Sequence, residues 1–184
     1  MGNKMTAEEM YQYCIENGFG EGMTKKWGIK HFSVIEADLK ENERVLMCFI
    51  GLHNYVSATE HNDNFAYAIT DKRIIMAQKK LFGDVLQSVL VDNLNDITVN
   101  SGMLFGVVTF DTIKEKFNIG TNKNSAKKIQ SVARDILFDL KNKKTSSTDS
   151  LSAADELLKF KQLLDMGAIT QDEFDAKKKA LLNL

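Results

Sequence analysis

Proline is absent from the 184-residue sequence, and cysteine occurs only twice. Without proline, the turns must be formed by Gly, Asn and Asp, which tolerate the backbone conformations that tight turns need. Cys14 and Cys48 lie far apart in the sequence, within helical or strongly apolar surroundings. Such surroundings are typical of reduced cysteines in a protein core, so we expect no disulfide bond.

Long apolar runs and a large net charge are also missing. The longest apolar run, residues 45–52, is far shorter than the ~20 residues that a membrane-spanning helix needs. The N-terminal segment contains no apolar stretch of the kind that secretory signals have. Because the formal net charge is −1, no overall charge attracts the chain to nucleic acid or anionic lipid. We therefore expect a soluble, cytoplasmic protein.

Two helices are predicted in a helical segment formed by residues 1–42. Thr6 and Glu9 have the spacing of a capping box, which predicts a helix over residues 7–17 that ends at the following glycine. A second helix is predicted over residues 24–39, and Trp27 is expected to anchor it on the main domain. The glycine-rich segment between the helices follows a helix and lacks a Gly-Lys-Ser/Thr sequence, so we interpret it as a loop without a nucleotide site.

Apolar residues alternate with period two between residues 43 and 120, which indicates β-strands. Polar turns separate the strands, among them the Thr70-Asp71-Lys72 turn of a β-hairpin. Seven strands are predicted, at residues 45–52, 65–70, 73–80, 85–91, 97–100, 106–111 and 115–119. A helix with one apolar face follows over residues 125–140. This order predicts an α+β fold, mainly β, in which an antiparallel barrel or sandwich over residues 43–140 is capped by the helix.

The last part of the chain is predicted to be a separate unit. Residues 141–152 are expected to be a flexible linker, because the segment up to residue 149 has no apolar residue. Residues 153–184 predict a helical hairpin with a tight turn at Gly167. Its apolar stripe contains Leu157, Phe160, Leu164, Phe174 and Leu181. Helices this short are only marginally stable in isolation. The stripe must therefore pack on the barrel, on a second copy or on a partner.

Two segments of the sequence resemble known families. Residues 163–174, LLDMGAITQDEF, resemble the short C-terminal domain called SHOCT. Residues 68–75, AITDKRII, resemble the YokE-like bacterial pleckstrin-homology (PH) domain. This resemblance implies a seven-stranded PH-like barrel closed by one helix. It also implies non-enzymatic roles in interaction or assembly in bacteria and their phages, and it implies no established ligand.

Catalytic and metal-binding patterns are not found in the sequence, so we expect no enzyme, no catalytic residues, no cofactor and no metal. His53, His61 and Asp63 have metal-ligand chemistry, but their spacing is not that of a recognised site. The connection that contains them has no Lys or Arg, which argues against the usual phosphoinositide site of PH domains.

The resemblance implies a bacterial or phage-derived interaction protein, and the apolar stripe predicts that its C-terminal hairpin mediates oligomerisation or binds a protein partner. The alternative is a peripheral membrane module that binds anionic lipid through basic residues of the capping helix and linker. These residues are Lys123, Lys127, Lys128, Arg134, Lys141, Lys143 and Lys144. Nucleic acid is not an expected ligand, because aromatic residues do not alternate with these basic residues.

Overall fold

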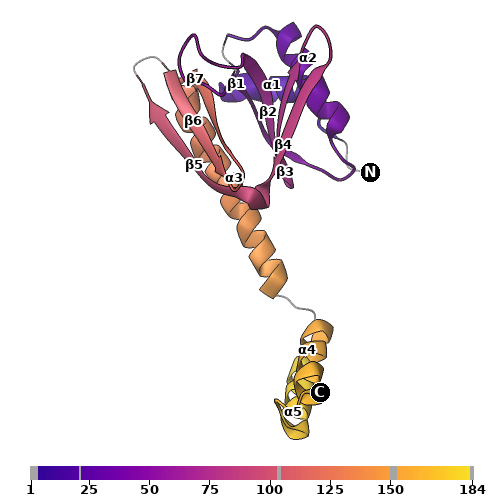
Figure 1. Ribbon diagram of the computed structural model, residues 1–184. Coiled ribbons are helices and arrows are strands. Elements are labelled where there is room, and N and C mark those ends of the chain that lie inside the picture. Colours follow the sequence, from indigo (N-terminus) through magenta and orange to yellow (C-terminus); the bar gives the residue numbers. More distant parts are fainter. Residues whose placement is uncertain (1–3, 21, 103–104, 150–152, 183–184) are drawn as a thin grey trace. The chain divides into compact units, whose positions relative to one another are not determined.

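The computed structural model describes residues 4–20, 22–102, 105–149 and 153–182. The chain forms two compact units, residues 1–138 and 139–184. The first unit contains two N-terminal helices, the β-strands and the first part of helix α3 (Figure 1). The second unit contains the remainder of α3 and the helices α4 and α5.

The N-terminal helices begin and end close to the residues that the sequence indicates. Helix α1 spans Ala7–Asn17, and its N-cap residue Thr6 forms the predicted capping box. Gly18 ends this helix with a φ of 70°, a left-handed conformation that glycine adopts without steric cost. Helix α2 spans Lys25–Asp38, with Thr24 as its N-cap residue. Both predicted helices are confirmed.

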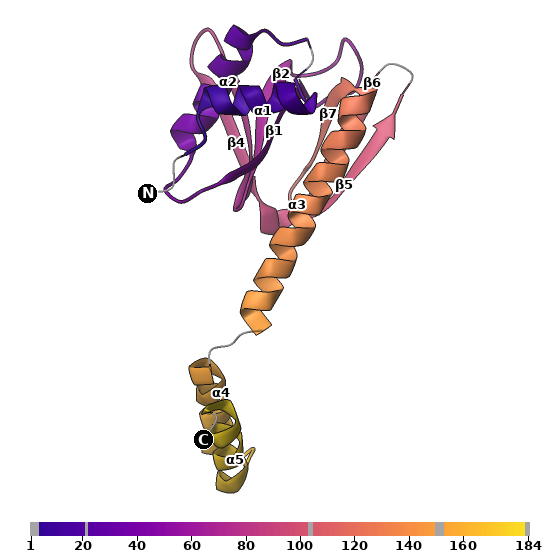
Figure 2. The same cartoon turned by 180° about the vertical axis from the view of Figure 1, so that it is seen from behind.

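The strands of the described residues form one antiparallel sheet in the order β4-β3-β2-β1-β7-β6-β5. Their bounds are β1 Val45–His53, β2 Asn64–Thr70, β3 Arg73–Lys79, β4 Asp84–Leu90, β5 Leu94–Ser101, β6 Phe105–Thr112 and β7 Lys116–Asn122. A short 3-10 helix, η1, connects β4 to β5 over Val91–Asn93. The predicted strands are confirmed, and the sheet curls into an open barrel whose end strands are β4 and β5 (Figures 1 and 2).

Aromatic side chains fill the inside of the curled sheet. Phe49 stacks on Tyr67 with ring centroids 4.7 Å apart, and Phe110 stacks on Phe117 at 5.2 Å. The centroids of Phe49 and Phe110 are 6.3 Å apart. This contact joins the two halves of the sheet, because Phe49 belongs to β1 and Phe110 to β6.

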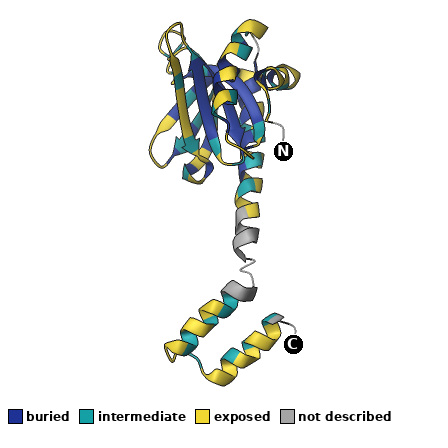
Figure 3. Ribbon diagram, turned by 90° about the vertical axis from the view of Figure 1, so that its right-hand side faces the viewer, coloured by how far each residue is buried: buried dark blue, intermediate teal, exposed yellow. Residues whose placement is uncertain are grey.

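The N-terminal helices cover the outer face of β1, β2 and β3. Residues 47–51, 65–70 and 74–78 are all buried, although alternate side chains of a strand point to opposite faces. Helix α1 contacts β1, and α2 contacts β2 and β3. The core therefore has two layers, one inside the curled sheet and one between the sheet and these helices (Figures 1 and 3).

Helix α3 spans Lys123–Asp149 and its first part covers β6 (Figure 2). A Cβ atom added to Gly106 of β6 would lie 2.4 Å from the Cβ atom of Ala126 in α3, so the two elements approach too closely for a side chain. The Nε2 atom of Gln130 donates a hydrogen bond of 3.2 Å to a backbone carbonyl of β5. The predicted capping helix is confirmed in this part.

The predicted end of this helix at residue 140 is wrong. Residues 141–149, which were expected to be a flexible linker, are helical, and residues 150–152 lie outside the described residues. The segment 141–149 has no apolar residue, but it also has no Gly or Pro. Its residue types each cost at most about 0.7 kcal/mol relative to alanine, so none of them stops a helix that has already formed.

Candidate interaction surfaces

The C-terminal hairpin consists of α4, Ala153–Asp165, and α5, Gln171–Leu182. Gly167 forms the turn with a φ of 70°. The amide of Thr170 donates to the carboxylate of Glu173 at 2.8 Å, and the amide of Glu173 donates to the Thr170 hydroxyl at 3.3 Å. The hydrogen bond from the Thr170 amide lowers the pKa of Glu173. The predicted turn is therefore present, and Thr170 and Glu173 form a capping box at the start of α5.

The five predicted partner-binding residues lie along this hairpin, and each is only partly buried. Leu157, Phe160 and Leu164 come from α4, and Phe174 and Leu181 come from α5. No residue between 156 and 181 is fully buried (Figure 3). The two helices contact each other, so they share the apolar stripe without closing it into a core.

Lys177 of α5 joins the two helices through two polar contacts. Its Nζ atom lies 5.2 Å from the ring centroid of Phe160 and 3.1 Å from Oε1 of Glu156. At exposed sites such cation–π contacts and ion pairs contribute about 0.5–1 kcal/mol each. These two contacts orient α5 on α4. The hairpin also has exposed apolar side chains, because Leu158 is 62% and Met166 is 72% exposed.

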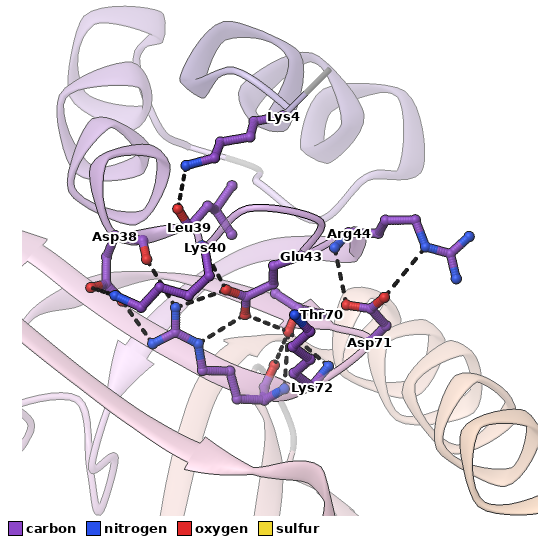
Figure 4. A network of polar contacts seen from close by, with 10 residues as sticks. Lys4, Asp38, Leu39, Lys40, Glu43, Arg44, Thr70, Asp71 and Lys72 are labelled. Carbon is purple, nitrogen blue, oxygen red and sulfur yellow. Dashed lines mark hydrogen bonds and ion pairs between the residues drawn. The ribbon is translucent and has the colours of Figure 1, made fainter. Parts of the chain in front are cut away.

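A polar network surrounds the Thr70-Asp71-Lys72 turn between β2 and β3 (Figure 4). The guanidinium of Arg73 donates to both carboxylate oxygens of Glu43, at 2.8 and 2.9 Å, and to Asp38 at 2.7 Å. The hydroxyl of Thr70 donates to Glu43 at 2.9 Å. The network connects the end of α2, the segment before β1 and the turn.

Glu43 is the centre of this network, and its side chain is 0% exposed. Burial raises the pKa of Glu43, but hydrogen bonds from Arg73, the Lys40 amide and Thr70 outweigh burial and hold this pKa at about 2, below its ordinary value of 4.5. The Arg73 side chain is 13% exposed. Because its donors are used inside the protein, we interpret this turn as a structural feature and not as a ligand site.

The fold buries the side chain of His53, whereas His61 and Asp63 lie in the connection between β1 and β2. His53 is buried, its Nδ1 atom lies 2.9 Å from the Tyr67 hydroxyl, and burial lowers its pKa. The Nδ1 atom of His61 accepts a hydrogen bond of 3.0 Å from the Asp63 amide. Within the described part of the chain, no group of three His, Cys, Asp or Glu residues is placed to hold a metal ion.

The basic residues of α3 lie on a surface of mixed charge. Lys123, Lys127 and Lys128 are exposed, whereas Arg134 lies 4.0 Å from the carboxylate of Asp96 in β5. None of the helices described here is long and apolar enough to cross a bilayer.

Trp27 is only partly buried, although the sequence predicts it to be an anchor. Its ring stacks on that of His31 with centroids 3.5 Å apart. Both residues line a shallow cleft of about 540 Å³ between α2 and the end of β3, together with Lys30, Lys79 and Lys80. The cleft is lined mainly by polar and charged side chains, and its residues do not form a recognisable catalytic group.

The apolar residues of β4 and of the turn before it are a feature that the sequence reasoning missed. Leu81 and Phe82 in this turn are 85% and 90% exposed, and Leu86 and Leu90 of β4 are 41% and 55% exposed. The signal was present in the sequence VLQSVL of residues 85–90, which does not alternate between polar and apolar residues.

Comparisons with known proteins identify two families in the chain. Residues 39–135 match the family described as bacterial PH domain, and residues 155–182 match the short C-terminal domain, SHOCT. Among solved structures, the Vps36 N-terminal PH domain is similar, with 17% sequence identity and a TM-score of 0.38 over 54% of this chain and 86% of that chain. The comparison with curated proteins found no significant match.

The first match covers more than half of the chain and includes every strand of the sheet. The second match covers most of the α4–α5 hairpin. Both families consist of non-catalytic modules. The two resemblances are confirmed at the level of these families, and the narrower YokE-like assignment stays a prediction. The chain belongs to the bacterial PH domain family and carries a SHOCT domain at its C-terminal end.

Proposed function

We propose that this protein is a non-enzymatic, cytoplasmic interaction or assembly protein of bacterial or phage origin. In this proposal the PH-like unit is a scaffold, and the α4–α5 hairpin mediates oligomerisation or binds a protein partner. The proposal rests on one observation: the hairpin carries an apolar stripe, but none of its residues between 156 and 181 is fully buried. Apolar helix faces that remain unburied are typical of helix-mediated recognition.

The unburied surface is large enough to matter energetically. Complete burial of a Leu or Phe side chain contributes about 1.5–3 kcal/mol. Each of the five stripe residues is only partly buried, so together they leave several kcal/mol of burial unrealised, on the order of one per residue. A second hairpin or a helix of a partner would supply the missing apolar surface.

Light scattering after size-exclusion chromatography tests this proposal on the full chain. We expect an oligomer at micromolar concentration, and the double variant Leu164→Asp/Phe174→Asp should lower its mass by removing the hairpin contact. The control variant Gln162→Asp/Ala176→Asp introduces the same charges at exposed positions of the same helices and should leave the mass unchanged. Circular dichroism checks that both variants keep their helix content.

Each outcome of this experiment has a distinct meaning. A monomeric wild-type chain would contradict self-association through the hairpin and leave the barrel of the same chain or a different protein as the partner of the stripe. An oligomer whose mass does not change with Leu164→Asp/Phe174→Asp would place the contact outside the hairpin. Flotation with anionic and neutral vesicles tests the lipid alternative, because salt-sensitive binding to anionic vesicles alone would favour the basic residues of α3.

A further inference from the structure

Strand β4 has one unpaired side, because it stands at the end of the sheet (Figure 1). It pairs with β3 along its whole length, from Arg73 opposite Leu90 to Lys79 opposite Asp84, without a bulge. In the part of the chain that the structure describes, no strand lies on its other side. About half of its backbone N–H and C=O groups therefore point away from the sheet and are available to another strand.

The opposite end strand, β5, is protected against such pairing. Its pairing with β6 is irregular between Leu94 and Asp96, and the side chain of Asp96 is 53% exposed. Gln130 of α3 donates a hydrogen bond to the carbonyl of Ile97. Bulges, edge charges and covering helices are the devices by which natural sheets prevent edge-to-edge contact. Residues 85–90 of β4 have no charge, no proline and no glycine.

Exposed apolar side chains are concentrated along the same edge. Leu81, Phe82, Leu86 and Leu90 are four of the eleven large apolar side chains that are exposed among the described residues. They fall within ten consecutive positions, and Leu81 and Phe82 are the most exposed of all eleven. An exposed apolar cluster of this kind is typical of an interaction site.

We propose that β4 pairs antiparallel with β4 of a second copy of this chain, about a two-fold axis at Gln87. Gln87 then lies opposite Gln87 of the second copy. The other opposed pairs are Val85 with Val89, Leu86 with Ser88, and Asp84 with Leu90. No two like charges face each other in this register, and valines lie at equal distances on both sides of the axis. The contact is isologous, so it closes after two copies.

The same register also covers the turn before β4. Asp84 lies opposite the last residue of β4 in the second copy, so Leu81 and Phe82 extend beyond it, alongside residues 91–93 of that copy. The pairing therefore accounts for both the free backbone groups and the exposed apolar residues. A second copy presents the same unpaired strand and the same exposed apolar residues, so it supplies both kinds of contact without another component, which is why we assign the edge to a second copy.

Cross-linking tests the register directly on the full chain. Gln87 is exposed, and the variant Gln87→Cys places two cysteines opposite each other within the reach of a disulfide. Mild oxidation should give a covalent dimer, while Cys14 and Cys48 remain buried and unreactive. Thr98→Cys, at an exposed position of β5, is the matched control. Equal cross-linking of both variants, or none in either, would overturn the proposed register.

Charge substitutions at the axis test the association itself. Sedimentation is measured in the Leu164→Asp/Phe174→Asp background, which removes contacts through the hairpin. Gln87→Lys or Gln87→Glu alone should weaken the dimer about fivefold by placing like charges opposite each other. A mixture of the two variants should restore the dimer, and Thr98→Lys should have no effect. The fluorescence of Trp27 checks that each variant is folded.

The results separate this proposal from the proposed function of the hairpin. A dimer that persists in the Leu164→Asp/Phe174→Asp background and is weakened by Gln87→Lys supports the β4 edge, whatever the hairpin does. A background variant that stays monomeric throughout the micromolar range overturns the edge contact and leaves the hairpin proposal intact. Equal dimerisation of Gln87→Lys and Thr98→Lys also overturns it.

Discussion

Replacing Arg73 by methionine would leave the buried carboxylate of Glu43 without its main partner. Arg73→Met keeps much of the apolar stem of the side chain but removes the guanidinium. Loss of one member of a buried ion pair typically costs about 3–5 kcal/mol. Glu43 keeps hydrogen bonds from the Lys40 amide and the Thr70 hydroxyl, both at 2.9 Å. We therefore expect the lower end of this range, about 3 kcal/mol.

The pKa of Glu43 determines how this contribution depends on pH. It is about 2 in the folded protein, against an ordinary value of 4.5. Because the folded-state pKa is the lower one, the unfolded chain binds a proton first as the pH falls. The carboxylate thus stabilises the fold fully above pH 4.5, and this contribution disappears as the pH falls towards 2. The difference corresponds to about 3 kcal/mol, and the hydrogen bonds from Lys40 and Thr70 contribute to it together with Arg73.

Urea unfolding followed by tryptophan fluorescence measures both effects. Trp27 is the single tryptophan of the chain and lies in the first compact unit, so its signal follows that unit alone. Arg44→Met is the matched control, because the Arg44 side chain is 73% exposed and lies 3.4 Å from Asp71. Its effect should stay within about 0.5 kcal/mol.

Two results would refute this reasoning about Glu43. The first is an equal loss of stability in Arg73→Met and Arg44→Met. The second is an unchanged difference between wild type and Arg73→Met as the pH is lowered from 4.5 to 2. This difference should shrink, because the pKa of Glu43 is no longer held near 2 when Arg73 is removed.

Two further predictions concern the core. Gly106→Ala should destabilise the first unit by about 1–3 kcal/mol, because the added Cβ atom would lie 2.4 Å from that of Ala126. Unfolding in urea should show this loss and a partial recovery on adding Ala126→Gly, and an unchanged stability would contradict the close approach. Burial raises the pKa of the Cys14 and Cys48 thiols, so a thiol reagent should label the native chain far more slowly than the unfolded chain. Rapid labelling of the native chain would show that these thiols are accessible.

Local features of this fold could be predicted because each depends on residues that are close in sequence. The capping boxes at Thr6 and Thr170 and the glycines at 18 and 167 involve contacts within a few residues. The β2–β3 turn and its neighbouring strands follow from period-two alternation in the same way. These signals were sufficient to identify the family and to predict most of the helix and strand bounds.

Other features depend on contacts between distant residues. Asp38, Glu43 and Arg73 meet only because α2 packs on the sheet. No local pattern in the sequence predicts this contact. The exposed edge of β4 follows from the order of strands in the sheet, which alternation does not determine. The composition of residues 141–149 did not predict that α3 continues to Asp149. A polar segment without Gly or Pro can prolong a helix that has already formed. The partner-binding residues of the hairpin stay a prediction.

Because α1 and α2 cover the sheet, they affect where this protein can be truncated. The family match begins at residue 39, and α2 ends at Asp38, so both helices lie outside the matched range. A fragment trimmed to this range would expose the outer side of β1, including Cys48 and Ile50, which are 0% and 4% exposed in the whole chain. A sheet stripped of one apolar covering is prone to aggregate. The segment that recurs in the family is therefore smaller than the segment that is needed to cover the sheet on both faces.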